Sequence, residues 1–310
     1  MVVAVTPAVL NYSLGQLGNV KLDDYNLTVT QNNLIDTLQM EVEQGQDKRS
    51  GKDPKSILTS LGNEITKKLS DKNLYELVMF SAGLKDLSDR RQIILYSKSY
   101  DMQQALKRTN LDGSLVSFAG DFFTIAEDNI SIDKSSAYID RTLSRNISVD
   151  QNGTVKVSVQ VKRLQTRDKS LDYVDPHSSF TFLIKENKSQ IKLAIPKGSK
   201  VTPGEGTPLK KVAGEGGNDI YEFQSDLTPK LEPNYNFSYI LPTKLALSAE
   251  STSVDSFLQI QNGGWPYRLV QSVSMPEGWH LVASNQKTLY AKSNETIYDK
   301  IIDRDELISL

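Results

Sequence analysis

The feature that most constrains the fold is a run of strict two-residue alternation, TVKVSVQVKRL, at positions 154–164. Its apolar side chains share one face of an extended chain: Val155, Val157, Val159 and Val161. An Asn-Gly pair, Asn152–Gly153, comes just before it and is a strong signal of a hairpin turn. The segment is therefore predicted to be a β-strand with one buried face.

From about Gly120 onward, strand patterns follow one another without helical spacing. The further predicted strands are SFTFLIKE, QIKLAIP, IYEFQSDL, NYNFSYILP, FLQIQ, YRLVQSVSMP and TLYAKS. Turn residues separate them at intervals typical of an antiparallel sandwich. We predict an all-β, immunoglobulin-like antiparallel sandwich over residues 126–310, and the pattern leaves open a small separate C-terminal β subdomain from about residue 250. The stretch TPGEGTPLKKVAGEGGND is predicted to be a long hairpin loop.

The first part of the chain mixes helix and strand signals. VVAVT is predicted to be a short buried strand, and RQIILYS a second strand. Between them, apolar residues recur at helical spacing in TQNNLIDTLQMEVEQG, DPKSILTSLGNEITKKLS and NLYELVMFSAGLKDLS. Interleaved helices and strands indicate an α/β domain, here residues 1–125. The predicted fold class is therefore an α+β chain in two parts.

Composition excludes several classes of function. The net charge of −2 gives no basic excess to attract nucleic acid or an anionic membrane. Cysteine is absent, and the two histidines, His177 and His280, are too far apart to form a helical metal pair. We predict no cofactor and no metal site. No apolar run is long enough to span a bilayer, so membrane attachment would require a segment outside this chain.

Acids and arginines are densest in GDFFTIAEDNISIDKSSAYIDRTLSRNISV, residues 120–149. We interpret this stretch as the joint between the two parts. FFTIAEDN would complete the sheet of the first part, and Asp140 would form surface pairs with Arg141 or Arg145. A calcium ion held by Asp128, Asn129 and Asp133 is an alternative, although the stretch lacks the ligand pattern of a known calcium loop.

Two stretches suggest ligands. The cationic turn GQDKRSGKDPK carries Arg49, Lys52 and Lys55 before a helix, where main-chain N–H groups favour a phosphate or an anionic glycan. Its alternative is an ordinary solvated loop. Trp265, Tyr267 and Trp279 could stack on sugar rings, or they could fix strand ends against the core. No pair of carboxylates stands out for glycosidase chemistry, and we assign no catalytic residue.

The chain resembles a bacterial family known as domain of unknown function 4012. The resemblance is carried by VVAVTPAVLNYSLGQLGNVKL, QIILYSKSYDMQQAL, IKLAIPKGSKV, NFSYILP and, above all, the segment from Asn129 to Arg141. Members of that family are typically held outside the cytoplasmic membrane, and the family has no established function. The resemblance implies an extracytoplasmic cell-envelope protein with a structural, adhesive or partner-binding role, and a cell-wall glycan or another envelope protein as partner.

The first part is also similar to the second half of a LytR–CpsA–Psr domain. Those enzymes transfer glycan polymers from a polyprenyl-pyrophosphate carrier, and NNLIDTLQMEVEQGQDKRSGKDPKSILTSL is similar to the segment that grips the pyrophosphate. Where they carry arginines, this chain has Glu41 and Glu43, which would repel the substrate. A non-catalytic role is therefore favoured. A glycopolymer phosphotransferase and a carbohydrate-binding module are the alternatives.

Overall fold

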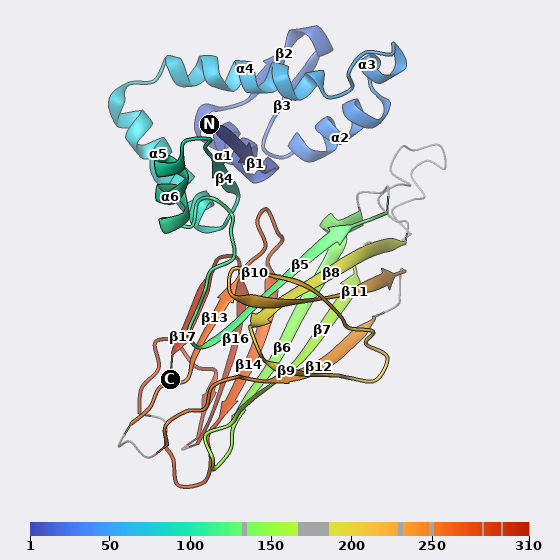
Figure 1. Cartoon of the computed structure of the whole chain (residues 1–310). Coiled ribbons are helices and arrows are strands. Elements are labelled where there is room, and N and C mark those ends of the chain that lie inside the picture. The colour runs from blue at the N-terminus through green and yellow to red at the C-terminus, as the bar shows by residue number, and fades with distance from the viewer. Residues whose placement is uncertain are drawn as a thin grey trace. The chain divides into compact units, whose positions relative to one another are not determined.

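The computed structural model describes residues 1–131, 135–166, 186–228, 232–247, 251–280, 282–292 and 294–309. The chain divides into two compact units, Met1–Gly113 and Ser114–Leu310. The first unit mixes helices with short strands and the second is built of strands (Figure 1). The predicted division into an α/β part and a β-rich part is therefore confirmed at this level.

Helices make up most of the first unit. In chain order the α-helices are α1 (Pro7–Leu17), α2 (Leu34–Gln44), α3 (Gln46–Arg49), α4 (Ser56–Ser70), α5 (Leu74–Asp89) and α6 (Tyr100–Arg108). Pro7 occupies the first turn of α1, where its missing N–H costs no hydrogen bond. A capping box between Asn73 and Glu76 starts α5. Buried Ile57, Leu61 and Ile65 follow helical spacing along α4, as the sequence predicts.

The strands of the first unit form two small antiparallel pairs. β1 (Val2–Val5) pairs with β4 (Ile93–Tyr96), and β2 (Val20–Leu22) pairs with β3 (Leu27–Val29). β2 and β3 belong to the core of this unit, together with buried leucines of α1 and α2. The prediction that VVAVT is buried is wrong, because all four residues of β1 are exposed. β1 has a single neighbouring strand, β4. An apolar strand is buried only where other elements pack over its faces, and its own sequence does not show whether they do.

Two sheets form the described part of the second unit. Sheet I has the order β10-β11-β8-β5-β13-β17, and sheet II has the order β15-β16-β14-β6-β7-β12-β9. The strands of sheet I are β5 (Asp121–Asn129), β8 (Asn187–Pro196), β10 (Lys210–Glu215), β11 (Asn218–Leu227), β13 (Asp255–Gln259) and β17 (Glu306–Ser309). Those of sheet II are β6 (Ile139–Val149), β7 (Val155–Gln165), β9 (Lys200–Pro203), β12 (Asn234–Ile240), β14 (Tyr267–Ser274), β15 (Tyr290–Ala291) and β16 (Glu295–Ile302).

The two sheets share one hydrophobic core. The valines of the alternating run lie in it, with Phe123, Ile191 and Leu193 of sheet I opposite them. The hairpin before that run is confirmed: Gly153 adopts a φ of 75°, and a Cβ there would lie 2.1 Å from the carbonyl oxygen of Leu245. Along β6 and β7, one face is thus fixed by burial, and the other is left free for different side chains.

Two expectations about this unit are corrected. The sheets are mixed and not purely antiparallel, because β13 runs parallel to β5 and β14 runs parallel to β6. Through these same pairings the strands beyond residue 250 extend both sheets at one end, β13 and β17 beside β5 and β14, β16 and β15 beside β6, so they do not form a separate C-terminal subdomain. Sequence-local turn signals say nothing about such long-range parallel pairings, which join residues more than 120 positions apart.

The boundary between the two units, between Gly113 and Ser114, lies closer to the N-terminus than predicted. FFTIAEDN, now in β5, pairs with β8 and β13 of the second unit and does not complete a sheet in the first. Within the long segment predicted to be a loop, β10 forms a hairpin with β11. β16 and β17 were not predicted, and the predicted strand SFTFLIKE falls at 179–186, almost wholly outside the described residues.

Candidate functional site

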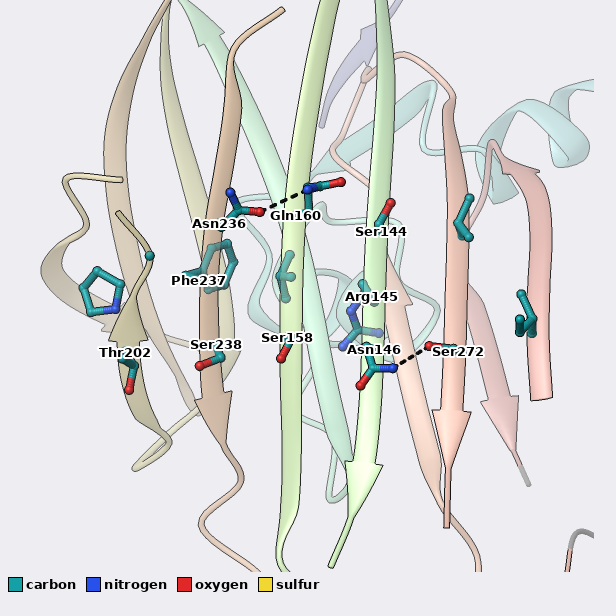
Figure 2. A pocket seen from close by; sticks show the side chains of 15 residues that line it. Ser144, Arg145, Asn146, Ser158, Gln160, Thr202, Asn236, Phe237, Ser238 and Ser272 are labelled. Atoms are coloured by element: carbon teal, nitrogen blue, oxygen red, sulfur yellow. Dashed lines mark hydrogen bonds between the residues drawn. The ribbon is translucent and has the colours of Figure 1, made fainter. Parts of the chain in front are cut away.

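A shallow groove lies on the outer face of sheet II. Since alternate residues of a strand point to opposite faces, the residues between the buried valines of β7 point outward, and so do their neighbours on β6 and β12. The groove has a volume of about 580 Å³. Its outward-facing polar residues, which we call the polar groove, are Ser144, Asn146, Ser158, Gln160, Thr202, Asn236, Ser238 and Ser272 (Figure 2).

Strand register arranges these side chains in two rows across the sheet. The first row crosses β9, β12, β7, β6 and β14 and consists of Thr202, Ser238, Ser158, Asn146 and Ser272. The second row consists of Asn236, Gln160 and Ser144, and it ends at Val270. Neighbouring strands are about 4.8 Å apart, so the first row spans about 19 Å. Ile297 of β16 lies directly beside Ser272 and closes that row with an apolar side chain.

Hydrogen bonding leaves much of the groove open to a ligand. The Asn146 side-chain amide donates to the Ser272 hydroxyl at 2.7 Å, and the Gln160 amide donates to the Asn236 amide oxygen at 3.2 Å (Figure 2). Among the described residues, the hydroxyls of Ser144, Ser158 and Ser238 form no hydrogen bond within the protein. Each such hydroxyl can donate one hydrogen bond and accept others.

Charge is absent from the outward face of the groove. The one ionisable residue in its lining is Arg145, whose side chain is fully buried on the other side of the sheet. Lys156 and Lys162 lie on the same strand as Ser158 and Gln160, beyond the two ends of this neutral stretch. The arrangement offers hydrogen bonds in both directions, and it offers neither an acid, a base nor a nucleophile with an activating partner.

The inner face directly behind the groove holds a buried ion pair. Arg145 Nη2 lies 2.5 Å from Asp121 Oδ2 and donates to the Tyr239 hydroxyl at 2.9 Å. Its Nη1 donates to Ser256 at 2.9 Å and to the Gln271 amide oxygen at 2.7 Å. The hydroxyls of Tyr239 and Ser256 in turn donate to Asp121, each at 2.6 Å. The carboxylate and the guanidinium therefore neutralise each other within a buried network, in which Arg145 Nε and Gln271 Nε2 have no hydrogen-bond partner among the described residues.

The electrostatics of this network fix its protonation state. Burial opposes the charge of Arg145, yet the nearby negative charge of Asp121 outweighs it and the pKa of Arg145 is raised. Burial, followed by the charge of Asp121, raises the pKa of Tyr239 well above its usual value. The guanidinium also lies over the Phe123 ring, with its central carbon 5.0 Å from the ring centroid. Arg145 therefore stays charged and Tyr239 stays neutral at all moderate pH values, so neither is suited to proton transfer.

A second polar network lies at the other end of the inner face. Glu127 accepts from Arg141 Nε at 2.9 Å and from Arg163 Nη2 at 3.3 Å. Arg163 also donates to Ser225, Asn187 and Ser189 at 2.7, 2.8 and 3.0 Å. Burial lowers the pKa of Arg163, and Glu127 offsets part of that cost.

The predicted surface pairs of Asp140 with Arg141 or Arg145 are therefore wrong. Arg141 and Arg145 have the same parity along β6 as the buried residues Leu143 and Ile147, so they face inward. Asp140 has the opposite parity and is exposed. The alternation of residues along β6 assigns Arg141 and Arg145 to the inward face, whereas their charge alone suggests that they face solvent. They are inward because the internal acids Glu127 and Asp121 form ion pairs with them.

The calcium hypothesis gains no support from the described residues. Asp128 lies 3.4 Å from Lys192, and the Asn129 side-chain oxygen accepts from the N–H and hydroxyl of Ser131. Asp133 lies outside the described residues. Among those that are described, no group of three or more His, Asp or Glu side chains could hold a metal ion.

The cationic turn places Arg49, Lys52 and Lys55 at the surface. Lys55 precedes α4, and its main-chain N–H donates to the Asp53 carboxylate at 2.9 Å, where an anionic ligand would otherwise bind. Within the turn, Asp47 is buried and its carboxylate accepts a hydrogen bond from the Tyr25 hydroxyl at 2.7 Å. An acid at this helix start makes the ordinary solvated loop the better interpretation.

Glu41 and Glu43 also have structural partners. Glu41 accepts from the main-chain N–H of Gln46 at the start of α3, and Glu43 lies 3.2 Å from Lys48. Within the first unit, all of whose residues are described, neither glutamate forms an ion pair with Arg49, Lys52 or Lys55. Glu41 and Glu43 thus add negative charge next to the turn, which disfavours a pyrophosphate there.

The three aromatic candidates do not form one platform. Trp265 is 52% exposed, Tyr267 is buried, and Trp279 is half-buried. Trp265 and Tyr267 line a small pocket of about 130 Å³ beside Glu127, whereas Trp279 lines a different one of about 780 Å³. Of the three, Trp265 is the most exposed and Trp279 is accessible from its own pocket, but the two line different pockets and so do not act on one ligand surface.

The polar groove was missed by sequence reasoning, although part of its signal was visible. Ser158 and Gln160 are the outward positions of the alternating run, and they are conspicuously uncharged between Lys156 and Lys162. The strands that flank the β6–β7 hairpin were not apparent, because β12 joins β7 and β14 joins β6 through long-range pairings, the second across 126 positions. The two rows of polar side chains can be recognised only when the order of the strands in the sheet is known.

Comparisons with known proteins leave the family open. No protein-family model matches the chain, and no curated protein matches it at a significant level. A proposed nutrient-binding protein from Legionella pneumophila is 11% identical, with a TM-score of 0.34 over 61% of this chain and 70% of that chain. An M1 zinc metallopeptidase from Deinococcus radiodurans is 10% identical, with a TM-score of 0.30 over 56% and 43%. Likenesses this distant carry no functional argument.

The described helices of the chain do not have the features of a membrane span. Among the described residues, no helix is both long enough and apolar enough to cross a bilayer.

Proposed function

We propose that this chain is a non-catalytic binding protein of the bacterial cell envelope, and that the polar groove of sheet II is its binding face. The proposal takes its location from the resemblance to the extracytoplasmic family known as domain of unknown function 4012. Its partner is a cell-wall glycan or another envelope component. We further propose that the second unit is an immunoglobulin-like module, because its two sheets pack around one hydrophobic core.

One observation supports binding over catalysis: the division of polar residues between the two faces of sheet II. The charged residues Arg141, Arg145 and Arg163 are committed to internal networks behind the sheet. The groove in front is lined by outward hydroxyls and amides without charge, and the charged residues of that face, Lys156, Lys162 and the Arg268–Asp299 pair, lie beyond its lining. Such groups hold a ligand by hydrogen bonds, and none of them is an ionisable side chain of the kind that acid–base catalysis uses.

The test is co-sedimentation of the whole chain with purified bacterial cell-wall sacculi. We expect the unmodified chain to sediment with the sacculi, and the double variant Asn146→Ala, Gln160→Ala to remain largely in the supernatant. The matched control is Gln224→Ala, which makes the same truncation on β11 of sheet I, where Gln224 is exposed. Sedimentation that both sets of variants retain equally would refute the groove as the binding face.

A second assay addresses catalysis. The chain is incubated with a polyprenyl-pyrophosphate-linked glycan donor and an acceptor glycan, and transferred product is measured. We expect no transfer above the rate without protein. Transfer that is lost on substitution of Arg49 and Lys52 by alanine would instead establish the glycopolymer phosphotransferase alternative.

A further inference from the structure

We propose that the polar groove binds an uncharged, extended oligosaccharide that lies across the strands of sheet II, along its two rows. This inference rests on the proposed function and names its ligand class. It rests on the chemistry of the lining residues, the direction of the rows, and the main-chain pairing of the strands beneath them.

The chemistry of the lining selects a neutral polyhydroxyl ligand. Serine hydroxyls and asparagine or glutamine amides both donate and accept hydrogen bonds, which matches sugar hydroxyl and acetamido groups. With no outward cation in the lining, the groove has nothing to neutralise a phosphate or a nucleic-acid backbone. The lysines at its margins, Lys156 and Lys162, are separated by the whole neutral stretch of β7.

The rows define the direction of the ligand. Along the first row, hydrogen-bonding side chains recur at every strand, about 4.8 Å apart, over about 19 Å. Along any single strand the two rows supply only two positions, about 6.7 Å apart. An extended chain therefore meets more partners across the strands than along them. At one end Val270 and Ile297 provide apolar contact for the C–H face of a sugar ring.

A peptide fits this surface less well. Peptides commonly bind sheets by adding a strand at an open edge, through main-chain hydrogen bonds. The strands beneath the centre of the groove, β6, β7 and β12, are each paired on both sides. Their main-chain groups are therefore already used. The groove is also shallow, and its apolar lining residues Pro203, Val270 and Ile297 lie beside the polar rows and form no deep pocket for a peptide side chain.

The experiment uses isothermal titration calorimetry to measure the binding of three probes, two glycans of four sugar units and one peptide, to the whole chain. The probes are the N-acetylglucosamine tetramer, cellotetraose, and an extended Gly/Ser peptide of comparable length. We expect at least one of the two glycans to bind and the peptide not to bind. Asn146→Ala and Gln160→Ala should each weaken glycan binding by about 2- to 10-fold, the loss expected for one hydrogen bond.

Controls separate the ligand class from the binding face. Gln224→Ala on sheet I should leave glycan affinity unchanged, and so should Lys162→Ala if the ligand is uncharged. Affinity that falls on Lys162→Ala and weakens with added salt would overturn the neutral-ligand inference in favour of an anionic glycan. Peptide binding that depends on Gln160 would overturn it in favour of a protein partner.

Failure here can be distinguished from failure of the proposed function. If the chain sediments with sacculi in a manner that depends on Asn146 and Gln160, but neither neutral glycan binds or competes, the ligand class is wrong and the binding face stands. If sedimentation does not depend on these residues, the binding face itself is wrong.

Discussion

Three consecutive residues of β6 show how differently the two faces of sheet II use polarity. Arg145 points inward and makes five contacts of an ionic, hydrogen-bonding or cation–π kind in the core. Ser144 and Asn146, on either side of it, point outward and line the groove. The inner side chain is charged and paired with an acid, whereas the outer ones are neutral and retain hydrogen-bonding capacity.

The difference assigns separate physical tasks to the two faces. A buried charge is tolerated only with its partners in place, so the inner residues should govern stability and the register of the strands. An exposed hydroxyl or amide contributes little to folding, so the outer residues can serve a ligand at almost no cost in stability. Substitutions on the two faces should therefore separate folding from binding.

The largest effect is expected for Arg145→Met. It leaves Asp121 as an unpaired acid in the core, which costs about 3–5 kcal/mol of the free energy of unfolding. Urea unfolding followed by tryptophan fluorescence measures this, because both tryptophans lie in the second unit. The double variant Asp121→Leu, Arg145→Met removes both charges and should be less destabilised than Arg145→Met alone. A loss below about 1 kcal/mol in the single variant would contradict a tightly coupled pair.

A smaller effect is expected for Arg163→Met in the second network. Glu127 keeps its other partner, Arg141, at 2.9 Å, so no carboxylate is left without a cation. The hydrogen bonds to Ser225, Asn187 and Ser189 are lost, which suggests about 1–3 kcal/mol. The same fluorescence measurement applies, with Arg145→Met as the reference. A larger loss than in that variant would reverse the proposed ranking of the two networks.

The two networks also mark the limit of what the sequence could predict. Alternation along β7 correctly predicted a strand with one buried face, and helical spacing correctly predicted α4 and α5. The burial of Arg145 was missed because Asp121, its partner, is 24 positions away on another sheet. Ser256, Tyr239 and Gln271 are further away still. The local sequence pattern predicts to which face of the sheet a side chain points. Whether a charged side chain finds an oppositely charged partner on that face depends on the order of the strands.

The first unit offers a third inward polar pair, Tyr25 with Asp47, whose contribution should depend on pH. Burial, followed by the hydrogen bond to Asp47, raises the pKa of Tyr25 to about 12. The folded chain thus retains the phenol proton above pH 10, where an unfolded tyrosine begins to lose it. The stabilisation is complete below about pH 10 and is lost as the pH rises toward 12.

Tyr25→Phe tests this dependence. At pH 8 it should lower the stability of the first unit by about 1 kcal/mol through loss of the hydrogen bond to Asp47. The difference between the two chains should shrink between pH 10 and pH 12, because a phenylalanine ring has no proton to lose. Unfolding is followed by helical circular dichroism, since the described helices longer than one turn lie in this unit. A difference that stays constant to pH 12 would contradict the raised pKa.

The smallest effect on folding is expected on the outer face. Asn146→Ala and Gln160→Ala each remove one side-chain hydrogen bond at the surface, to Ser272 and Asn236 respectively. Each should change the free energy of unfolding by no more than about 0.5 kcal/mol, because water replaces the lost partner. Tryptophan fluorescence in urea checks this on the same scale as Arg145→Met. If Asn146→Ala destabilised the chain as strongly as the inward substitutions do, the outer amides would be part of the folding framework, and a loss of binding in that variant could no longer be assigned to the groove.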